Sequence, residues 1–502
     1  MTAKASEILI FKLGVAFKRV MLLFIISFLF LTAGTAQPEN VTVKGNAKQY
    51  AGFNLSLRHY ANYISYKSEE LGNVKVDENG DFSLSFYIPE ITYAYMDLGV
   101  FRGFIYLEPG KTYEIILPPY TPVREADRFN LYYSHEKIVI GIKNADASTL
   151  NKNINKFDNE YNFLFNKNAF RLFNKRDVKL TDEIVAGLDS MFPGFGNEFF
   201  DHYKQFRYAK LYMLSMKRQE NRVISRFYSK ASVEFENPAY WETFALLFKG
   251  FFTGYFTSKK GIALRTELAD STDFKRLSDA LGADTLYAQR EFREVVLLKV
   301  LYDAFYSGNY DKGKIIEVLN SAVRQGGTER VRKIAGELFR KVNHLRVGTP
   351  APEFSLYNIN GKERSLSSYK GRFVYLNFCN TENHACKKDF QLLDAFSKRM
   401  RRDLTIVSIA TDRDAAKLEG FVKSHKYKWD FLYFGDQANV IFDYDIRVLP
   451  TYILIDPDGN VLMSPAPAPE ENFMARFYEA AKNYRYKKLR KERPKERSIY
   501  DF

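Results

Sequence analysis

The sequence predicts a multidomain protein with an N-terminal all-β module, an α-helical middle and a C-terminal α/β domain. The chain has 502 residues, which is enough for about three domains of ordinary size. Apolar residues first recur at every second position, then at helical spacing, and finally in short runs that alternate between the two patterns. Hydrophobic residues make up 46% and aromatic residues 16%, a composition that excludes a wholly disordered chain.

The first 36 residues have the pattern of a secretory signal peptide. Basic residues precede an apolar run over 20–31, and small residues then lead to Ala36. This run is shorter than the roughly 20 residues that a membrane-spanning helix needs. We therefore expect cleavage after Ala36 and export to the periplasm or cell envelope. The alternative is an uncleaved N-terminal helix that anchors the chain.

We assign residues 38–122 to a β-sandwich-like module because apolar side chains alternate along several short runs. Alternation of this kind is typical of half-buried strands. Residues 77–80 and 108–111 are rich in Gly, Pro, Asn and Asp, which favour turns between such strands. The alternating positions are Phe53, Leu55 and Leu57, Val74 and Val76, Phe82, Leu84 and Phe86, and Tyr113, Ile115 and Leu117.

Residues 123–345 are predicted to be α-helical, since apolar residues there recur at intervals of three and four. Aromatic residues are dense around 240–241 and 251–256. They indicate either a helical core filled with rings or a groove for a carbohydrate or peptide. The helical spacing is clearest at Phe292, Val295, Leu298, Tyr302 and Phe305, and at Val331, Ile334, Leu338, Val342 and Leu345.

A domain boundary is expected at Pro350 and Pro352, because each proline removes a backbone donor and restricts the residue before it. Beyond it, residues 346–482 alternate between strand and helix patterns, which predicts an α/β layer with a largely parallel core. The strands are expected over 373–378, 404–410, 429–433 and 451–456, and the helices over about 385–400, 415–425 and 439–444.

The last residues, 483–502, are assigned to a basic tail. The whole chain has 74 Lys and Arg against 60 Asp and Glu, a net charge of +14. The segment 482–497 holds nine Lys or Arg and two Glu, and their difference is half of that excess. Such a run is typical of a solvated extension, and weak contact with an anionic membrane surface is the alternative. Export argues against a nucleic-acid partner.

Four segments of the C-terminal domain, residues 350–356, 374–378, 448–456 and 458–461, resemble in order and spacing the TlpA-like branch of the thioredoxin fold. The resemblance covers about residues 346–482. The β module upstream resembles the accessory domain that precedes TlpA-like domains in envelope proteins of Bacteroidetes. The resemblance implies a thioredoxin-like domain that acts as a thiol-disulfide oxidoreductase on client proteins without a cofactor.

In this family a Cys-x-x-Cys motif opens the first long helix. Cys386 matches the second cysteine of that motif, whereas Asn383 replaces the first. An amide cannot form the mixed disulfide through which thiol exchange proceeds. Cys379 is the candidate partner, in an unusual Cys-x6-Cys pair, provided that the Cα atoms can approach within about 7 Å. If the site is open, His384 beside the helix start would favour a thiolate at Cys386.

Pro450 corresponds to the cis-proline that faces the thiol in thioredoxin-like proteins. A cis bond there would leave the adjacent backbone free to pair with an extended peptide segment of a client. The alternative is an ordinary trans turn before a strand. The six histidines show no paired spacing typical of a zinc site, so we expect no metal.

The leading interpretation is an exported thiol-disulfide oxidoreductase with an altered Asn-x-x-Cys site that acts on the thiols or disulfides of envelope proteins. The second is a redox-inactive thioredoxin-fold binding or structural module, which the missing first cysteine favours. Peroxidase-like chemistry at a single thiol ranks last, because the residues after the strand at 373–378 lack the proline of the peroxiredoxin branch. The sequence leaves open whether Cys379 and Cys386 form a disulfide.

Overall fold

The computed structural model describes residues 40–124, 127, 133–193, 195–216, 219–400, 402–412, 414–435 and 437–492. The predicted signal peptide and residues 493–502 of the basic tail lie outside the described residues. The chain divides into two compact units. The first holds the described residues up to 121 together with 136–223 and 234–244, and the second holds the remainder.

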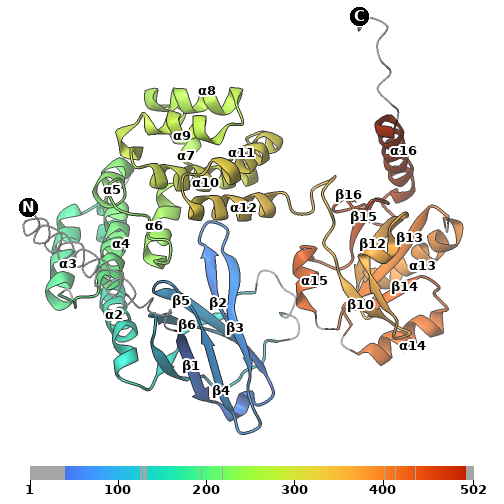
Figure 1. The fold of residues 1–502 in the computed structure, drawn as a ribbon, viewed down its shortest axis with the longest axis horizontal. Helices are drawn as coiled ribbons and strands as arrows, with labels where there is room; N and C mark the ends of the chain where they lie inside the picture. The colour runs from blue at the N-terminus through green and yellow to red at the C-terminus, as the bar shows by residue number, and fades with distance from the viewer. Residues whose placement is uncertain are drawn as a thin grey trace, which may run out of the picture. The chain divides into compact units, whose positions relative to one another are not determined.

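The N-terminal part is built from two β-sheets (Figure 1). One sheet has the strand order β4-β1-β7-β9 and the other the order β3-β2-β5-β6-β8. Alternate residues of both sheets, such as Val43 of β1 and Leu57 of β2, enclose one hydrophobic core, as expected for a sandwich. The strands are β1 Val41–Asn46, β2 Asn54–Asn62, β3 Lys67–Lys75, β4 Asp81–Phe86, β5 Thr92–Leu98, β6 Phe101–Leu107, β7 Thr112–Ile116, β8 Glu136–Val139 and β9 Gly141–Ile142.

This strand-rich part ends at Ile142, whereas the sequence placed its end at residue 122. β8 pairs in parallel with β6, and β9 pairs antiparallel with β7. The chain therefore returns to both sheets after it leaves β7. The two returning strands have only four and two residues, too few to show an alternating pattern.

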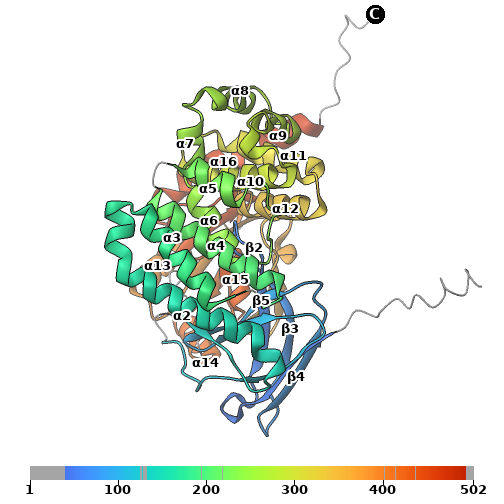
Figure 2. The ribbon, with the colours of Figure 1, turned by 90° about the vertical axis from the view of Figure 1, so that its left-hand side faces the viewer.

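The middle of the chain is helical, as predicted. Within the first unit, α2, α3 and α4 lie side by side (Figures 1 and 2). The rings noted in the sequence at Tyr240, Trp241 and Phe252 are buried, which supports their assignment to a helical core. The helices are α2 Thr149–Phe170, α3 Val178–Met191, α4 Glu198–Ser215, α5 Glu220–Phe227, α6 Pro238–Leu247, α7 Phe251–Tyr255, α8 Ile262–Asp270, α9 Phe274–Gly282, α10 Arg290–Ser307, α11 Lys312–Gln325 and α12 Glu329–Val342.

The C-terminal domain is the predicted α/β layer, a sheet with the strand order β11-β10-β14-β13-β12-β15-β16. β12, β13 and β14 run parallel at its centre, and the outer strands pair antiparallel. Its elements are β10 Ser355–Asn358, β11 Glu363–Ser365, β12 Phe373–Cys379, α13 His384–Arg399, β13 Leu404–Ala410, α14 Ala415–His425, β14 Asp430–Tyr433, α15 Ala438–Asp443, β15 Thr451–Ile455, β16 Val461–Met463 and α16 Phe473–Glu492.

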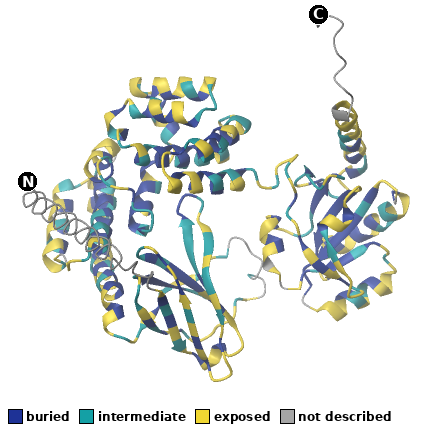
Figure 3. Ribbon diagram, in the orientation of Figure 1, coloured by how far each residue is buried: buried dark blue, intermediate teal, exposed yellow. Residues whose placement is uncertain are grey.

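Both faces of this sheet are covered, which explains why all seven residues of β12 are buried (Figure 3). Tyr375 and Cys379 point to the core that contains α13, α14 and α16. Leu376 and Phe378 point to the opposite core, which contains α15. This period-two division places Cys379 in the same core layer as Cys386 of α13.

α16 continues without a break to Glu492. The sequence placed the end of the domain at residue 482, so the first part of the assigned basic tail belongs to this helix. Lys, Arg and Tyr are compatible with a helix, and positive charge alone does not end one. Within the part of the chain that the structure describes, no helix is long and apolar enough to cross a membrane.

Candidate thiol site at the start of α13

Cys379 is the last residue of β12, and contacts with β13 and with the residue that follows that strand hold it in place. Its Sγ donates a weak hydrogen bond to the carbonyl oxygen of Ile409, 3.8 Å away. Its own carbonyl accepts from the backbone N–H of Thr411 at 2.9 Å and from the Thr411 hydroxyl at 3.2 Å. The side chain is fully buried. Cys379 therefore sits on a rigid sheet, sealed from solvent.

Cys386 lies in the first turn of α13, which Asn383 caps. The Asn383 side chain accepts a hydrogen bond from the backbone N–H of Cys386 at 3.1 Å, the usual role of an N-cap asparagine. His384, the first residue of the helix, is exposed, and Asn383 is half-buried. The Cys386 side chain turns inward and is fully buried. The position of the family's first cysteine is thus the accessible one, and it holds an amide.

The two thiols share one small region. The backbone N–H of Asn380, which directly follows Cys379, donates to the Sγ of Cys386 at 3.4 Å. Standard backbone bond lengths then keep the Cα of Cys379 within about 6 Å of that sulfur. Both cysteines are free thiols. The loop after β12 therefore folds back far enough to bring the two side chains together.

Burial controls the protonation of both thiols. It raises the pKa of Cys386 to about 11, and the Asp389 and Asp412 carboxylates act in the same direction. The Asn380 N–H lowers the pKa of Cys386 without reversing the change. Burial raises the pKa of Cys379 well above its usual range, with the neighbouring Cys386 adding to the effect. The sequence predicts a thiolate at Cys386 only for an open site, and in this closed conformation desolvation raises the pKa of the thiol instead.

Two buried carboxylates lie beside the thiols and were not predicted from the sequence. Asp412 follows β13 and accepts from the backbone N–H of Thr381 at 3.1 Å, so it fixes the loop between β12 and α13. Asp389 lies one turn after Cys386 and accepts from the Tyr452 hydroxyl at 2.7 Å. Burial raises the pKa of both carboxyl groups.

Both carboxylates left a signal in the sequence. Parallel strands end at the same edge of a sheet, so the residues after β12 and β13 had to lie close together, which would have placed Asp412 beside Thr381. Asp389 is three residues after Cys386 and therefore on the same face of the helix.

Pro450 precedes β15, and its peptide bond with Leu449 is cis. Pro450 and Leu449 are half-buried, while Val448 is 69% exposed. Leu449 packs against both cores of the domain. β15 pairs antiparallel with β12, and Thr451 at the start of β15 lies opposite Phe378. Pro450, which precedes Thr451, is therefore at the same end of the sheet as Cys379, the last residue of β12.

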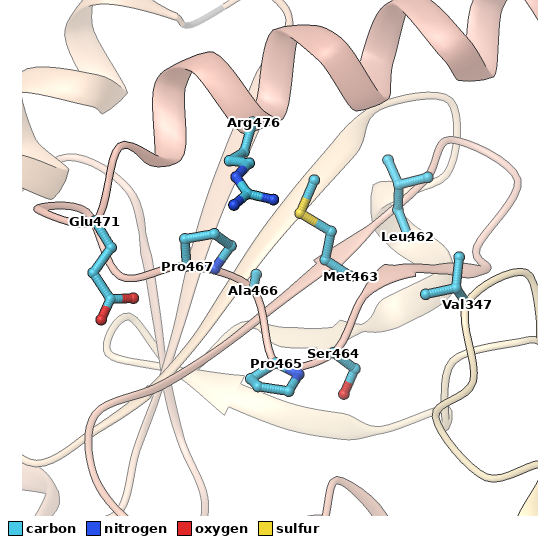
Figure 4. Close-up of a pocket in the computed structure, with 9 residues that line it drawn as sticks. All are labelled: Val347, Leu462, Met463, Ser464, Pro465, Ala466, Pro467, Glu471 and Arg476. Atoms are coloured by element: carbon cyan, nitrogen blue, oxygen red, sulfur yellow. The ribbon is translucent and has the colours of Figure 1, made fainter.

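A second surface feature of the domain is separate from the thiols. A depression of about 590 Å³ lies between β16 and the first turn of α16, where Arg476 reaches down beside Met463 and Pro467 (Figure 4). Neither cysteine lines it. Its lining residues are Val347, Leu462, Met463, Ser464, Pro465, Ala466, Pro467, Glu471 and Arg476. Among the described residues, no cluster of His, Cys, Asp or Glu could hold a metal ion.

Known proteins resemble the C-terminal domain. The AhpC/TSA family model matches residues 347–464. The thiol-disulfide oxidoreductase ResA of Bacillus subtilis is 32% identical over 130 residues, which are 26% of this chain and 72% of ResA. ResA of Geobacillus thermodenitrificans is 26% identical over 129 residues, 26% of this chain and 74% of that protein. The structure of a thiol-disulfide oxidoreductase from Bacteroides fragilis is 26% identical and matches 26% of this chain and 98% of its own, with a TM-score of 0.24.

Proposed function

This chain belongs, through its C-terminal domain, to the AhpC/TSA family of thioredoxin-fold proteins alongside the thiol-disulfide oxidoreductase ResA, and we propose that it exchanges thiols and disulfides with client proteins. Cys386 is the reacting residue in this proposal, and Cys379 replaces the missing first cysteine as its partner. The observation that carries the proposal is the 3.4 Å contact between Cys386 Sγ and the amide that follows Cys379.

The proposed exchange uses two thiols of this protein and one disulfide of the client, and its atoms, protons and electrons balance. The Cys386 thiolate attacks a client sulfur, forms a mixed disulfide and releases the first client thiolate. Cys379 then attacks the sulfur of Cys386, forms the Cys379–Cys386 disulfide and releases the second client thiolate. The two protons lost by the cysteines end on the two client thiols. The client is reduced by two electrons, and the protein is oxidised by two.

The proposal requires the start of α13 to open, because Cys386 is buried in the closed conformation. Asn383, His384 and Ala385 form the outer side of this turn and are half-buried or exposed. Moving the turn outward would hydrate Cys386 and remove the desolvation that raises its pKa. The closed state is then a resting state, and client binding beside Pro450 is the step that we propose to favour the open one.

A second candidate function is that of a redox-inactive binding or structural module. The burial of both thiols, together with their raised pKa values, favours it. In that case Asn383 serves only as a helix cap and the surface beside Pro450 binds a client segment without chemistry. The two candidates differ in one testable respect, which is whether Cys386 of the folded protein ever forms a mixed disulfide.

Trapping of the mixed disulfide tests the proposal. The reduced Cys379→Ala variant, incubated with a peptide disulfide, should accumulate a peptide adduct at Cys386, because the resolving thiol is absent. The Cys386→Ala variant is the matched control and should accumulate none. Mass spectrometry of the folded proteins reads the result. If the folded Cys379→Ala variant remains unmodified while the same chain reacts after unfolding, Cys386 is inaccessible and the binding module is the correct function.

We further propose that the protein works outside the cytoplasm, in the periplasm or cell envelope, and that residues 1–36 direct its export. The sequence of this leader supports the proposal, since basic residues, an apolar run and small residues follow one another there. The clients would then be envelope proteins in a compartment where disulfides persist. N-terminal sequencing of the protein isolated from its source cells should begin at Gln37, and an intact leader would support the anchored alternative.

A further inference from the structure

α16 is held on its domain by one face only. Phe473, Phe477 and Ala481, spaced by four residues each, are buried in the core beside α13. The ring of Tyr484 packs against Phe373 with their centroids 5.4 Å apart. These residues account for the packing of the first half of the helix. The opposite face of α16 carries none of these buried residues.

The outward face of α16 carries an exposed apolar stripe. Tyr478, Tyr486 and Leu489 are 54%, 66% and 62% exposed. At 3.6 residues per turn, these positions fall within roughly 80° of the helix circumference and extend over about 16 Å of its length. We call these three residues the α16 stripe. Scattered apolar residues on a surface are ordinary, but an aligned set on one face of a helix indicates an interaction surface.

Cations surround the α16 stripe. Residues 482–492 contain six Lys or Arg and one Glu. Arg485 pairs with Asp403 at 2.9 Å and Lys488 lies 3.7 Å from Asp458, so these two also help to hold the helix. Lys482, Lys487 and Arg490 are exposed and form no ion pair with another described residue. Lys482 lies on the stripe itself, and Arg490 lies beside it.

We propose that the outward face of α16 binds the surface of an anionic lipid bilayer. The α16 stripe enters the boundary between headgroups and acyl chains, while the cations contact lipid phosphates. The helix lies in the plane of the surface, and its domain remains on the aqueous side because the packed face points the other way. The positive charge of this face complements the negative charge of an anionic lipid surface.

The residue types at this face fit a lipid surface. Tyrosine has an apolar ring and a polar tip, and it concentrates at membrane interfaces for that reason. Lys and Arg have long apolar stems that keep their charge at the headgroup level. An apolar face flanked by cations is the pattern of helices that lie on anionic membranes. The partner would keep the thiol site close to membrane-bound clients, independently of whether Cys386 is reactive.

Vesicle binding tests the proposal with the chain from Gln37 to Phe502, which contains every described residue and lacks the apolar leader. It should sediment with vesicles of phosphatidylglycerol mixed with phosphatidylcholine and not with pure phosphatidylcholine. Added salt should weaken the binding, since it screens the attraction. Equal binding to both kinds of vesicle, or to neither, would overturn the proposal.

Two triple variants separate the two contributions. The first, Tyr478→Ser with Tyr486→Ser and Leu489→Ser, removes the apolar contact. The second, Lys482→Glu with Lys487→Glu and Arg490→Glu, reverses the charge. Each should lower the vesicle partition coefficient at least about tenfold. All six positions are exposed, so the fold should persist, and circular dichroism checks that it does.

The matched control for charge is Lys362→Glu with Lys370→Glu and Lys417→Glu. These three exposed lysines lie elsewhere on the same domain, and their reversal changes the net charge equally. The control should bind vesicles much as the unmodified chain does. If it loses binding as strongly as the α16 variants, net charge and not this face governs the attraction. If the unmodified chain dimerises and the triple serine variant does not, this face binds a second copy of the chain, and the proposal is rejected.

Discussion

The end of β12 and the start of α13 bring two thiols together, but the two cysteines belong to secondary-structure elements that differ in how easily they can move. Cys379 ends a central strand that pairs with β13 at every residue and with β15 over residues 374–378. Cys386 belongs to the first turn of a helix, whose outer side is exposed to solvent. Moving Cys379 would disrupt the sheet, whereas moving Cys386 requires only that one helical turn and its cap open. Any thiol reactivity must therefore begin at Cys386.

The largest expected difference between the two cysteines is in the pH dependence of alkylation. With the pKa of Cys386 raised to about 11, its thiolate is scarce at neutral pH. Labelling of the folded protein by iodoacetamide should therefore rise about tenfold per pH unit from pH 7 to pH 10. Cys379 should remain unlabelled in the same samples. Peptide mapping measures both rates, and a plateau at Cys386 near pH 8 would show that its pKa is not raised.

Restoring the family motif should have the next largest effect. Asn383 is half-buried at the cap of α13, so Asn383→Cys would place a thiol at the accessible end of the helix, where its partial positive charge lowers a thiol pKa. We expect insulin disulfide reduction at least about tenfold faster than in the unmodified chain. Ala385→Cys, an added thiol at an exposed neighbouring position, is the control. Equal activity of the two variants would mean that the helix cap has no special role.

A smaller change should follow from removing the carboxylate next to Cys386. The charge of Asp389 raises the pKa of the Cys386 thiol, so Asp389→Asn should lower that pKa and speed alkylation several-fold at pH 8. Asp394→Asn on the same helix, where Asp394 pairs with Lys398, provides the comparison and should leave the rate unchanged. Slower alkylation of Asp389→Asn would show that this carboxylate does not oppose the thiolate.

The smallest expected effect concerns the stability of the helix start. Asn383→Ala removes the side chain that accepts the N–H of Cys386, which should lower the free energy of unfolding by about 1 kcal/mol. Asn383→Ser keeps a capping oxygen and should retain most of that stability. Urea denaturation measures both values. If the two variants are equally stable, the cap does not hold the turn closed.

Much of the C-terminal domain could be predicted from the sequence because its signals are local. The strand at 404–410 and the helix at 415–425 have the bounds that their hydrophobic patterns predicted. The returning strands β8 and β9 were missed, since their pairing with β6 and β7 depends on contacts distant in sequence. The helix α16 was not predicted, and the domain end expected at residue 482 falls inside it, because the run of positive charge was interpreted as a solvated extension.

The candidate site, like the fold, could be predicted from the sequence only in part. Cys386 and Asn383 could be placed at the helix start by counting from the preceding strand. The burial of Cys386 could not, because it results from the path of the loop that Asp412 fixes through Thr381. A thiolate was expected only for an open site, and burial in the closed conformation raises the pKa of the Cys386 thiol. The local sequence pattern was enough to locate the site. Contacts between residues distant in the sequence determine the burial and the pKa of Cys386.

The state of the two sulfurs across a redox titration tests whether Cys379 replaces the missing first cysteine as the partner of Cys386. The folded chain is equilibrated in mixtures of reduced and oxidised dithiothreitol, quenched with acid and mapped without reduction. We expect a single peptide pair joined through Cys379 and Cys386 as the mixture becomes oxidising. Two thiols that stay alkylatable after unfolding in every mixture would contradict it.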